Sequence, residues 1–557
     1  MTRVRLIKKN IPLISCFVIV LLMVQCTSKE HVHTGERSKH PRLVVGIVID
    51  QMRYDFLYRY WDKYGNGGFK RLLREGYLCA NTNINYIPTY TGPGHASIFT
   101  GTTPGVNGIV ANEWFDRKKG ESLYCVSDDK YNTVGSLSKK EGQMSPNNLL
   151  TTTITDELKL SDNFNSKVIG VSLKDRAAIL PAGHSANAAY WYDGKSGNWI
   201  TSTYYMDSLP GWVNKFNNEK QPVKFLYQKW ETLLPIKSYT ESTKDNSEFE
   251  EPYPGETVPV FPYNLWRISA NSYDLIRETP FGDTYTKNFA EEVIKQEKMG
   301  KGDFTDFLTI NLASTDYVGH RFGPNSVEIE DTYIRLDKDL EEFLDFLDSD
   351  IGKDNVLVFI TADHGVDQNP GYLKSKGLPG GFFKDSYIGD TLNDFLKKTY
   401  QSDSLIKSYE NQQVYLNYAL LKLKNIQIKE ISQKIADFVK TFPGVANAIP
   451  TSDFESAQFS EGQLSLVQRG FYGPRCGDVA IILEPGWIDG NKTRGTTHGS
   501  GYAYDTHIPL IFYGWGIKPG CTYTPVSITD IAPTIAAFLQ IQPPSGCTGK
   551  PIVALTR

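Results

Sequence analysis

The sequence predicts an α/β protein with a mostly parallel central sheet sandwiched by helices. Three short runs rich in apolar and β-branched residues carry this prediction, at residues 43–49, 304–311 and 356–360. Runs of this length and composition are typical of strands that are buried on both faces of a parallel sheet. Apolar residues at helical spacing lie between the runs, at 69–76 and 328–347. The chain therefore alternates strands with helices, as α/β proteins do.

Length and charge limit the classes of protein that fit. A chain of 557 residues indicates one large domain with insertions or two domains. The formal net charge is −4, and no basic block stands out beyond the extreme N-terminus. These features do not indicate nucleic acid as a partner.

The N-terminus resembles an export signal. Four basic residues within the first nine precede an apolar run at 11–24, which is too short for a comfortable membrane span, so we assign residues 1–26 to a signal peptide. Cys26 and a polar tether at 27–40 are similar to a bacterial lipoprotein signal, although Gln25 is bulkier than the residue usual there. Membrane attachment through a lipidated Cys26, cleavage elsewhere and an uncleaved anchor all stay open. Each predicts export, to the periplasm or the cell surface.

An exported chain can form disulfides. Five cysteines follow Cys26, and Cys521 lies close enough in sequence to Cys547 for the two to pair. The sequence does not fix the connectivity.

Acidic residues end two of the predicted strands. Asp50 follows the run at 43–49, and Asp363 with His364 follows the run at 356–360. Ligands of open α/β sheets bind beyond the carboxyl ends of the strands. Carboxylate and imidazole groups are good ligands for Zn²⁺-like ions. The alternative for each aspartate is an ordinary cap of the next turn.

Thr91 precedes a Gly-Pro-Gly turn at the predicted start of a helix. Its hydroxyl would meet the free N–H groups and the positive end of the helix dipole. It is either an N-cap or a nucleophile, and the second role requires a cation, because a threonine hydroxyl is a weak acid. We expect His95 to pack under the turn. Asn112, in a later loop, could donate to an oxyanion or form a structural turn.

Lys174 and Arg176 follow a predicted strand at 167–173. On an extended segment these two side chains would share a face. They could bind phosphate oxygens, Arg176 as a fork and Lys174 as a point charge. The alternative is a solvated surface pair.

Two further segments carry possible metal ligands. Asp316 and His320 are four residues apart, which on a helical turn places both on one face. His498 lies in a glycine-rich loop at 494–504, and we rank it above His507, which we expect to pack. Three carboxylates and three imidazoles suffice for two cations, and paired metals roughly 3.5–4 Å apart clamp both the attacking and the leaving oxygen of a phosphoryl transfer.

The catalytic core is expected at residues 41–183, 282–365 and 495–557. Residues 184–281 lose periodicity and are rich in Trp, Tyr and Pro, which indicates an inserted lid. Residues 366–494 alternate strands and helices as a small α+β subdomain would.

The order of these motifs resembles the alkaline phosphatase superfamily: Asp50, the TGPGHAS run at Thr91, the D-x3-H pair, the TADHG run and the T-H-G of His498. Thr91 with Asn112, and Lys174 with Arg176, are similar to the PafA-type phosphate-irrepressible alkaline phosphatases of bacteria. The sulfatase signature is absent at Thr91.

This resemblance implies a two-zinc hydrolase with a covalent phosphothreonine at Thr91. It implies Asp316, His320 and His498 as ligands of one zinc, and Asp50, Asp363 and His364 as ligands of the other, to which Thr91 also binds. It assigns the non-bridging phosphate oxygens to Asn112, Lys174 and Arg176. Its substrates would be small phosphate monoesters, and we expect a monomer.

Three alternatives stay open at this stage. A nucleotide pyrophosphatase/phosphodiesterase would share the metals and the threonine but lack the cationic pair. A transferase of phosphate to a lipid or glycan is a further possibility. A non-catalytic surface binding protein would have lost a ligand or the nucleophile, and every one of these residues is present.

Overall fold

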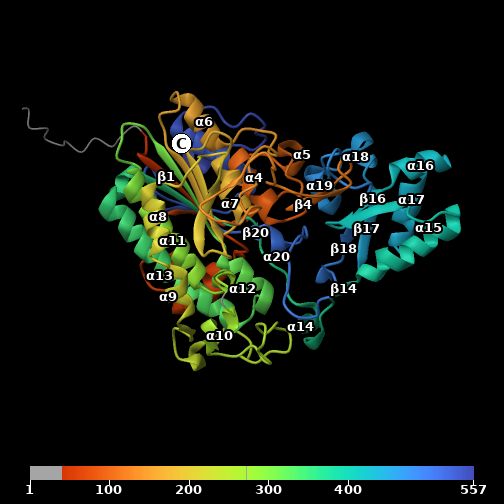
Figure 1. The fold of residues 1–557 in the computed structure, drawn as a ribbon, viewed down its shortest axis with the longest axis horizontal. Coiled ribbons are helices and arrows are strands. Elements are labelled where there is room, and N and C mark those ends of the chain that lie inside the picture. Colours follow the sequence, from red (N-terminus) through yellow and green to blue (C-terminus); the bar gives the residue numbers. More distant parts are fainter. Residues whose placement is uncertain (1–39, 271, 557) are drawn as a thin grey trace, which may run out of the picture. The chain divides into compact units, whose positions relative to one another are not determined.

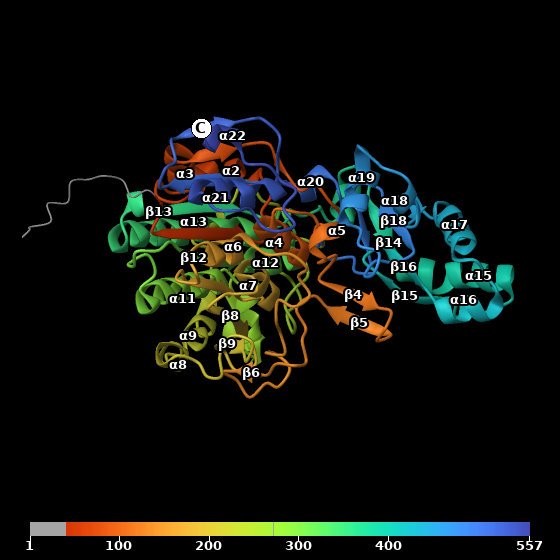
Figure 2. The same cartoon turned by 90° about the horizontal axis from the view of Figure 1, so that it is seen from above.

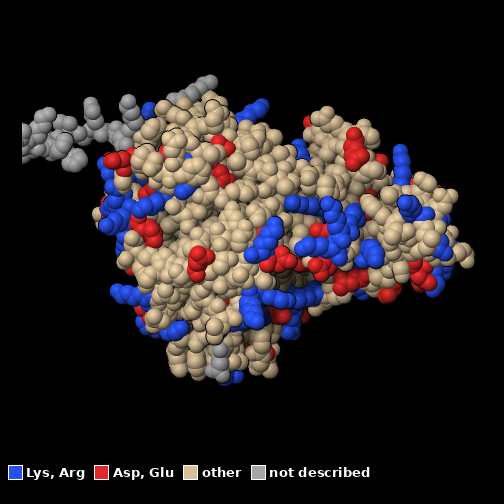
Figure 3. Space-filling model, turned by 45° about the horizontal axis from the view of Figure 1, so that its top comes forward, with Lys and Arg blue, Asp and Glu red and all other residues tan. Residues whose placement is uncertain are grey.

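The computed structural model describes residues 40–270 and 272–556. The predicted signal peptide, with Cys26, lies outside the described residues, as does nearly all of the tether. Within the described part of the chain, no helix is both long and apolar enough to cross a membrane. On the face drawn in Figure 3, Lys and Arg are interspersed with Asp and Glu, with no broad region of one sign.

A ten-stranded sheet forms the centre of the fold (Figures 1 and 2). Its middle five strands are parallel, and the strands outside them are mostly antiparallel. The sheet is therefore mixed, with a parallel middle at the predicted strands. In spatial order the parallel strands are β13 (Val356–Thr361), β1 (Leu43–Ile49), β12 (Asp306–Leu312), β7 (Val168–Ser172) and β8 (Ala188–Asp193). The outer strands are β22 (Gly520–Thr522), β2 (Tyr77–Cys79) and β21 (Leu510–Gly514) on one side, and β9 (Asn198–Ser202) and β6 (Thr133–Val134) on the other.

Helices cover both faces of the sheet, and neighbouring residues of β1 show how (Figure 1). Gly46 points to one face, where a Cβ atom on it would lie 3.3 Å from the Phe99 ring. Ile47 points to the other face, where it lines a small cavity together with Leu340. The first face is covered by α4 (Thr91–Thr100) and α7 (Asp175–Ala182), and the second by α11 (Phe281–Glu297) and α13 (Val327–Asp350).

The helix predicted at 69–76 forms at nearly those residues, as α3 (Phe69–Glu75), which ends at Gly76. Helix α21 (Ile531–Leu539) lies near the other end of the chain. Glycine ends α3 because it lacks the Cβ that would meet the Leu72 carbonyl oxygen at 2.4 Å.

Residues 366–494 contain a separate four-stranded antiparallel sheet, which we call the inserted sheet. Its strands, in spatial order, are β15 (Ile406–Glu410), β16 (Gln413–Leu416), β18 (Val479–Leu483) and β17 (Val445–Pro450). Helix α17 (Ile428–Val439) packs on it, and the two share an apolar core that includes Ile435 and Val479.

The lid prediction for residues 184–281 places its first boundary too early. Strand β8 pairs in parallel with β7, and β9 pairs with β8, so residues 188–202 extend the central sheet. The sequence hid these strands because each is a short segment between turn signals, without a continuous aliphatic run or a clear alternation of apolar and polar residues. Short helices follow, including α8 (Gly211–Asn218), α9 (Gln221–Leu226) and α10 (Leu265–Ser269).

The cysteines remain unpaired in the described chain. Cys521 is exposed and Cys547 partly buried, and both are free thiols, so the suggested pair does not form here.

Candidate active site

The site lies where the carboxyl ends of β1, β12 and β13 meet. Strand β1 pairs in register with both neighbours, Val48 opposite Thr361 and Ile49 opposite Leu312. Asp50 therefore emerges beside Asp363, and β12 leads directly into α12 (Ser314–Phe322). This helix carries Asp316 and His320, while His498 arrives from the glycine-rich loop.

The predicted ligands form two overlapping groups. The donor atoms of Asp50, Asp363 and His364 lie within 4.8 Å of one another, and so do those of Asp316, His364 and His498. His364 is common to both groups, and its ring stacks on that of His498 with 3.5 Å between centroids. His320 is close to the second group, with its Nε2 3.1 Å from Asp316 Oδ1. This grouping differs from the one that the resemblance implies, because His364 belongs to both groups and not only to the group of Asp50 and Asp363.

The chemistry of the first group fits a divalent cation. Within the described chain, Asp50 Oδ1 and Asp363 Oδ2 are buried and have no hydrogen-bond partner. Each lies 3.5 Å from His364 Nε2. Burying a carboxylate oxygen without a partner costs free energy, which a bound cation would offset.

Backbone carbonyl groups orient two of the histidines. His320 Nδ1 lies 2.9 Å from the Thr496 oxygen, and His498 Nδ1 lies 2.7 Å from the Thr89 oxygen. Such a contact favours the tautomer with the proton on Nδ1 and leaves Nε2 as the ligand atom.

Thr91 is the first residue of α4 and is almost completely buried. Its Oγ1 lies 3.4 Å from each of three nitrogen atoms: His364 Nε2, Lys174 Nζ and Arg176 Nη2. Tyr90, not Thr91, occupies the N-cap position, so the capping alternative does not hold. The Thr91 hydroxyl instead faces these three nitrogen atoms.

The start of α4 fits closely against the end of β13. A Cβ atom on Gly94 would lie 2.5 Å from the Asp363 carbonyl oxygen, so only glycine permits this approach. His95 lies beneath the turn, with Nδ1 2.9 Å from the Thr91 carbonyl oxygen and 3.3 Å from Asp363 Oδ2.

Lys174 and Arg176 both reach Thr91, but not from an extended segment. Strand β7 ends at Ser172, Lys174 is the N-cap of α7, and Arg176 lies in the first turn of that helix. The predicted geometry was therefore wrong, because the helix begins one residue after Lys174. The N-cap and second helical positions nevertheless direct both cations to one hydroxyl.

Lys174 hydrogen-bonds to one carboxylate in each of the two groups of possible metal ligands. Its Nζ donates to Asp50 Oδ2 at 2.9 Å and to Asp316 Oδ2 at 2.6 Å. Burial lowers the pKa of Lys174, but Asp316 and Asp50 together raise it well above its ordinary value. The two carboxylates therefore favour the charged form of Lys174.

Asn112 lies beside the residue that follows Thr91. Its Oδ1 accepts a hydrogen bond of 2.7 Å from the Gly92 backbone N–H. The amide oxygen is thus committed to the turn, which leaves Nδ2 as the group that could donate to a ligand.

The pKa values of Asp50 and Asp363 are shifted in opposite directions. Burial, with repulsion from Asp363, raises the pKa of Asp50 to about 6. Burial also opposes ionisation of Asp363, but His364, His95 and Lys174 outweigh it and hold the pKa of Asp363 well below its usual range.

Gln51 is a site residue that sequence reasoning missed. Its backbone N–H donates to Asp363 Oδ1 at 3.2 Å, and its Nε2 donates to Asp316 Oδ1 at 2.7 Å. It has a left-handed backbone with φ of 64°, and its side chain fits against Gly319, where a Cβ atom would lie 1.9 Å from Oε1. Gln51 therefore links a carboxylate of each group. The one local signal was its position directly after a strand-end aspartate.

Asp505 shapes the loop that carries His498. Its Oδ2 accepts hydrogen bonds from the backbone N–H groups of Gly499 at 3.1 Å and Ser500 at 2.8 Å. His507 lies outside the site, since its ring stacks on Tyr54 and its Nε2 lies 2.9 Å from the Ala80 oxygen.

Comparison with known proteins extends the likeness over nearly the whole chain. The family model described as type I phosphodiesterase / nucleotide pyrophosphatase matches residues 44–502. Alkaline phosphatase PafA of Elizabethkingia meningoseptica is 47% identical, over 92% of this chain and 94% of its own. Alkaline phosphatase PhoV of Synechococcus elongatus is 47% identical, over 93% of each chain. A relative from Myroides odoratus that is named a calcium-transporting ATPase is 46% identical, over 96% of this chain and 98% of its own.

A solved structure has the same fold. The crystal structure of wild-type alkaline phosphatase PafA superposes with a TM-score of 0.91 at 47% identity, covering 93% of this chain and 99% of that one. With the matches in sequence, it shows that the chain belongs to the type I phosphodiesterase / nucleotide pyrophosphatase family, alongside the alkaline phosphatases PafA and PhoV.

Proposed function

We propose that this protein is an alkaline phosphatase that hydrolyses phosphate monoesters through a phosphothreonine at Thr91. The observation that carries the proposal is the setting of the Thr91 hydroxyl, which has two cationic side chains and a ligand-type histidine at 3.4 Å each. The names of the relatives PafA and PhoV support the same activity.

The two donor groups would hold two zinc ions. Asp50, Asp363 and His364 would bind one beside Thr91, and the other ligands would be Asp316, His320 and His498. When bound, the ions supply Lewis acidity for the attacking oxygen and for the departing one. Gln51 would fix the position of the two metal sites relative to each other, because it donates a hydrogen bond to a carboxylate of each site.

The residues around Thr91 would then act in two displacements. Thr91 Oγ1 forms a bond to phosphorus while the bond to the ester oxygen breaks and the alcohol leaves. Water later cleaves the phosphothreonine, which releases phosphate and restores the hydroxyl. Lys174, Arg176 and the Asn112 amide would hold the non-bridging oxygens, whose charge they stabilise in both displacements.

The cationic pair favours a monoester over a diester. A phosphate monoester carries one more negative charge than a diester, and Lys174 and Arg176 both reach the Thr91 hydroxyl where that charge would lie. A phosphodiesterase is the second candidate, because the matching family model bears that description.

The first experiment compares kcat/KM for an aryl phosphate monoester and the matching aryl methyl diester, with zinc present. We expect a ratio far above one. A ratio well below one would indicate a phosphodiesterase, in which Thr91 and the metal ligands would keep the same roles. Hydrolysis of neither ester would instead favour a transferase or a binding protein.

We also propose export of a monomer that carries a lipid on Cys26. The support is the order of basic residues, apolar run and cysteine in the N-terminal sequence. Mass spectrometry of the protein from membranes would show the acyl mass, and Cys26→Ser should abolish it. An unmodified cysteine would refute the lipid attachment.

A further inference from the structure

The two cations beside Thr91 are held in different ways. Lys174 donates to one carboxylate of each ligand group, so the metal ligands themselves fix its position. The guanidinium of Arg176 reaches Tyr124 instead, a residue outside both ligand groups. Its Nη1 donates to Tyr124 Oη at 3.0 Å, while its Nη2 lies 3.4 Å from Thr91 Oγ1. The direction of Arg176 therefore depends on a tyrosine that has no place among the metal ligands.

The hydroxyl of Tyr124 lies between Asp175 and Arg176. It donates its one proton to Asp175 Oδ1 at 2.5 Å, so a lone pair is left to accept from Arg176 Nη1. Asp175 Oδ1 is itself fixed, because it accepts from the Arg176 backbone N–H at 2.6 Å in the first turn of α7. Burial raises the pKa of Tyr124 well above its ordinary value, although Arg176 opposes the shift, so the hydroxyl keeps its proton.

Holding Nη1 of Arg176 fixes the other two nitrogen atoms, because the guanidinium is planar and rigid. Nε lies on the same edge of that plane as Nη2, and within the described chain it is buried without a hydrogen-bond partner. A buried donor without a partner costs free energy, which phosphate oxygens on this edge would offset. Tyr124 thus occupies one side of Arg176 and leaves the edge beside Thr91 open to a phosphoryl group.

A β-hairpin carries Tyr124 to this position (Figure 2). Tyr124 is the last residue of β5 (Glu121–Tyr124), which pairs with β4 (Glu113–Asp116) in the antiparallel sense. The backbone contact continues beyond the strands, since the Cys125 N–H donates to the Asn112 oxygen at 2.8 Å. The base of one hairpin therefore holds both Asn112, a candidate phosphate ligand, and the tyrosine that directs Arg176.

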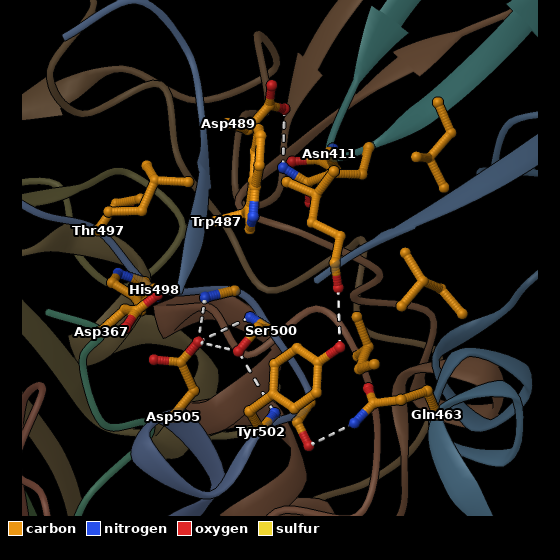
Figure 4. Close-up of a pocket in the computed structure, with 18 of the residues that line it drawn as sticks. Asp367, Asn411, Gln463, Trp487, Asp489, Thr497, His498, Ser500, Tyr502 and Asp505 are labelled. Carbon is orange, nitrogen blue, oxygen red and sulfur yellow. Dashed lines mark hydrogen bonds between the residues drawn. The ribbon is translucent and has the colours of Figure 1, made fainter. Parts of the chain in front are cut away.

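The inserted sheet holds the outer part of the hairpin. Ser122 Oγ donates to Glu410 Oε1 at 2.7 Å, and Asn411 Nδ2 donates to the Glu113 oxygen at 2.8 Å. Asn411 also lines a cavity of about 210 Å³ between the inserted sheet and the loop of His498 (Figure 4). The hairpin is thus tied to the inserted sheet along one strand and to the site at its base.

We propose that Tyr124 is a positioning residue, which fixes Arg176 for the phosphoryl group and so contributes to the preference for monoesters. This inference rests on the proposed monoesterase function. A free arginine side chain loses conformational entropy when it binds a ligand, and the contact with Tyr124 restricts it before the substrate arrives. The gain is larger for a monoester than for a diester, because the monoester carries the additional negative charge.

The test is a double-mutant cycle on the zinc-loaded protein, with Tyr124→Phe, Arg176→Ala and the variant that carries both. Two quantities are measured: kcat/KM for an aryl phosphate monoester, and the affinity for inorganic phosphate by calorimetry. Tyr124→Phe should lower both by about tenfold in the wild type, the scale of a hydrogen bond to a charged group. In the Arg176→Ala background it should lower them by less than about twofold. The monoester-to-diester ratio of kcat/KM should fall with Tyr124→Phe as well.

Tyr239→Phe is a matched control. The Tyr239 hydroxyl also donates to an aspartate at 2.5 Å, namely Asp331 of α13, whose other oxygen accepts from Arg335 at 2.7 Å. This substitution removes the same kind of contact without touching Arg176, so it should leave both measured quantities unchanged. A role of Tyr124 in stability alone would lower Tm and activity equally with and without Arg176.

The outcomes distinguish the two proposals. If the wild type hydrolyses the monoester, and Tyr124→Phe has the same effect in both backgrounds or none in either, the positioning role is refuted and the monoesterase stands. If the wild type hydrolyses no monoester, the proposed function fails, and the phosphate affinities of the same four proteins still decide the role of Tyr124. Absence of phosphate binding in the wild type would refute both.

Discussion

Removing Lys174 tests whether the charge at this position selects monoesters. Lys174 is 3% exposed, and its Nζ lies 3.4 Å from Thr91 Oγ1. Lys174→Ala deletes one buried cation next to the place where the phosphoryl oxygens would lie.

The magnitude follows from the extra charge of the monoester. Two unit charges about 4 Å apart interact by roughly 4 kcal/mol at an effective dielectric constant of about 20. At about 1.4 kcal/mol per factor of ten, the loss for the additional charge is roughly 10³-fold. We therefore expect Lys174→Ala to lower the monoester-to-diester ratio of kcat/KM by about two to three orders of magnitude.

The assay measures kcat/KM of both esters for the wild type and the variant, with bound zinc counted by elemental analysis. Metal content matters because Lys174 also donates to Asp50 and Asp316. Lys159→Ala is a matched control, since Lys159 is 4% exposed and donates to Ser166 and Asn187 away from the site.

Equal losses on the two esters, at full metal content, would refute the reasoning. They would mean that Lys174 positions the carboxylates without sensing the charge of the substrate. A fall in both activities with Lys159→Ala would instead indicate a general loss of stability.

Three further predictions concern Thr91, Gln51 and Asp283. Thr91→Ala should abolish turnover while both metals stay bound, and activity within tenfold of the wild type would remove Thr91 as the nucleophile. An asparagine in Gln51→Asn tolerates the left-handed backbone, but its side chain is one methylene too short to reach Asp316. Metal affinity, measured by competition with a chelator, should therefore fall by about tenfold or more. The control Gln540→Asn, at an exposed left-handed position, should leave the metal affinity unchanged. Burial raises the pKa of Asp283 to about 8, so the folded state holds a proton that the unfolded chain releases near its ordinary value, and stability falls as pH rises between the two. Asp283→Asn should therefore gain Tm relative to the wild type from about pH 5 to about pH 9, and a difference in Tm that does not change with pH would contradict this.

Several features follow from the sequence alone, because they depend on local chemistry. The runs at β1, β12 and β13 are predicted nearly to the residue, since a strand buried on both faces is rich in apolar residues along its whole length. The polar residues that end them, Asp50 and Asp363, are equally visible. Parallel strands end at one edge of a sheet, so the approximate place of a site follows as well.

Other features were decided only by tertiary structure. The role of Gln51 depends on the register of β1 with β12 and β13. This register places Asp363 next to the backbone N–H of Gln51 and Asp316 next to its side-chain amide. Strands β8 and β9 belong to the sheet because of their neighbours, not because of a clear alternation. The cavity at His498 exists where residues 411–412 and 481–489 of the inserted segment meet the glycine-rich loop. Contacts between residues far apart in the chain have no local signature, so neither that cavity nor the contact of Tyr124 with Arg176 could be seen before the fold was known.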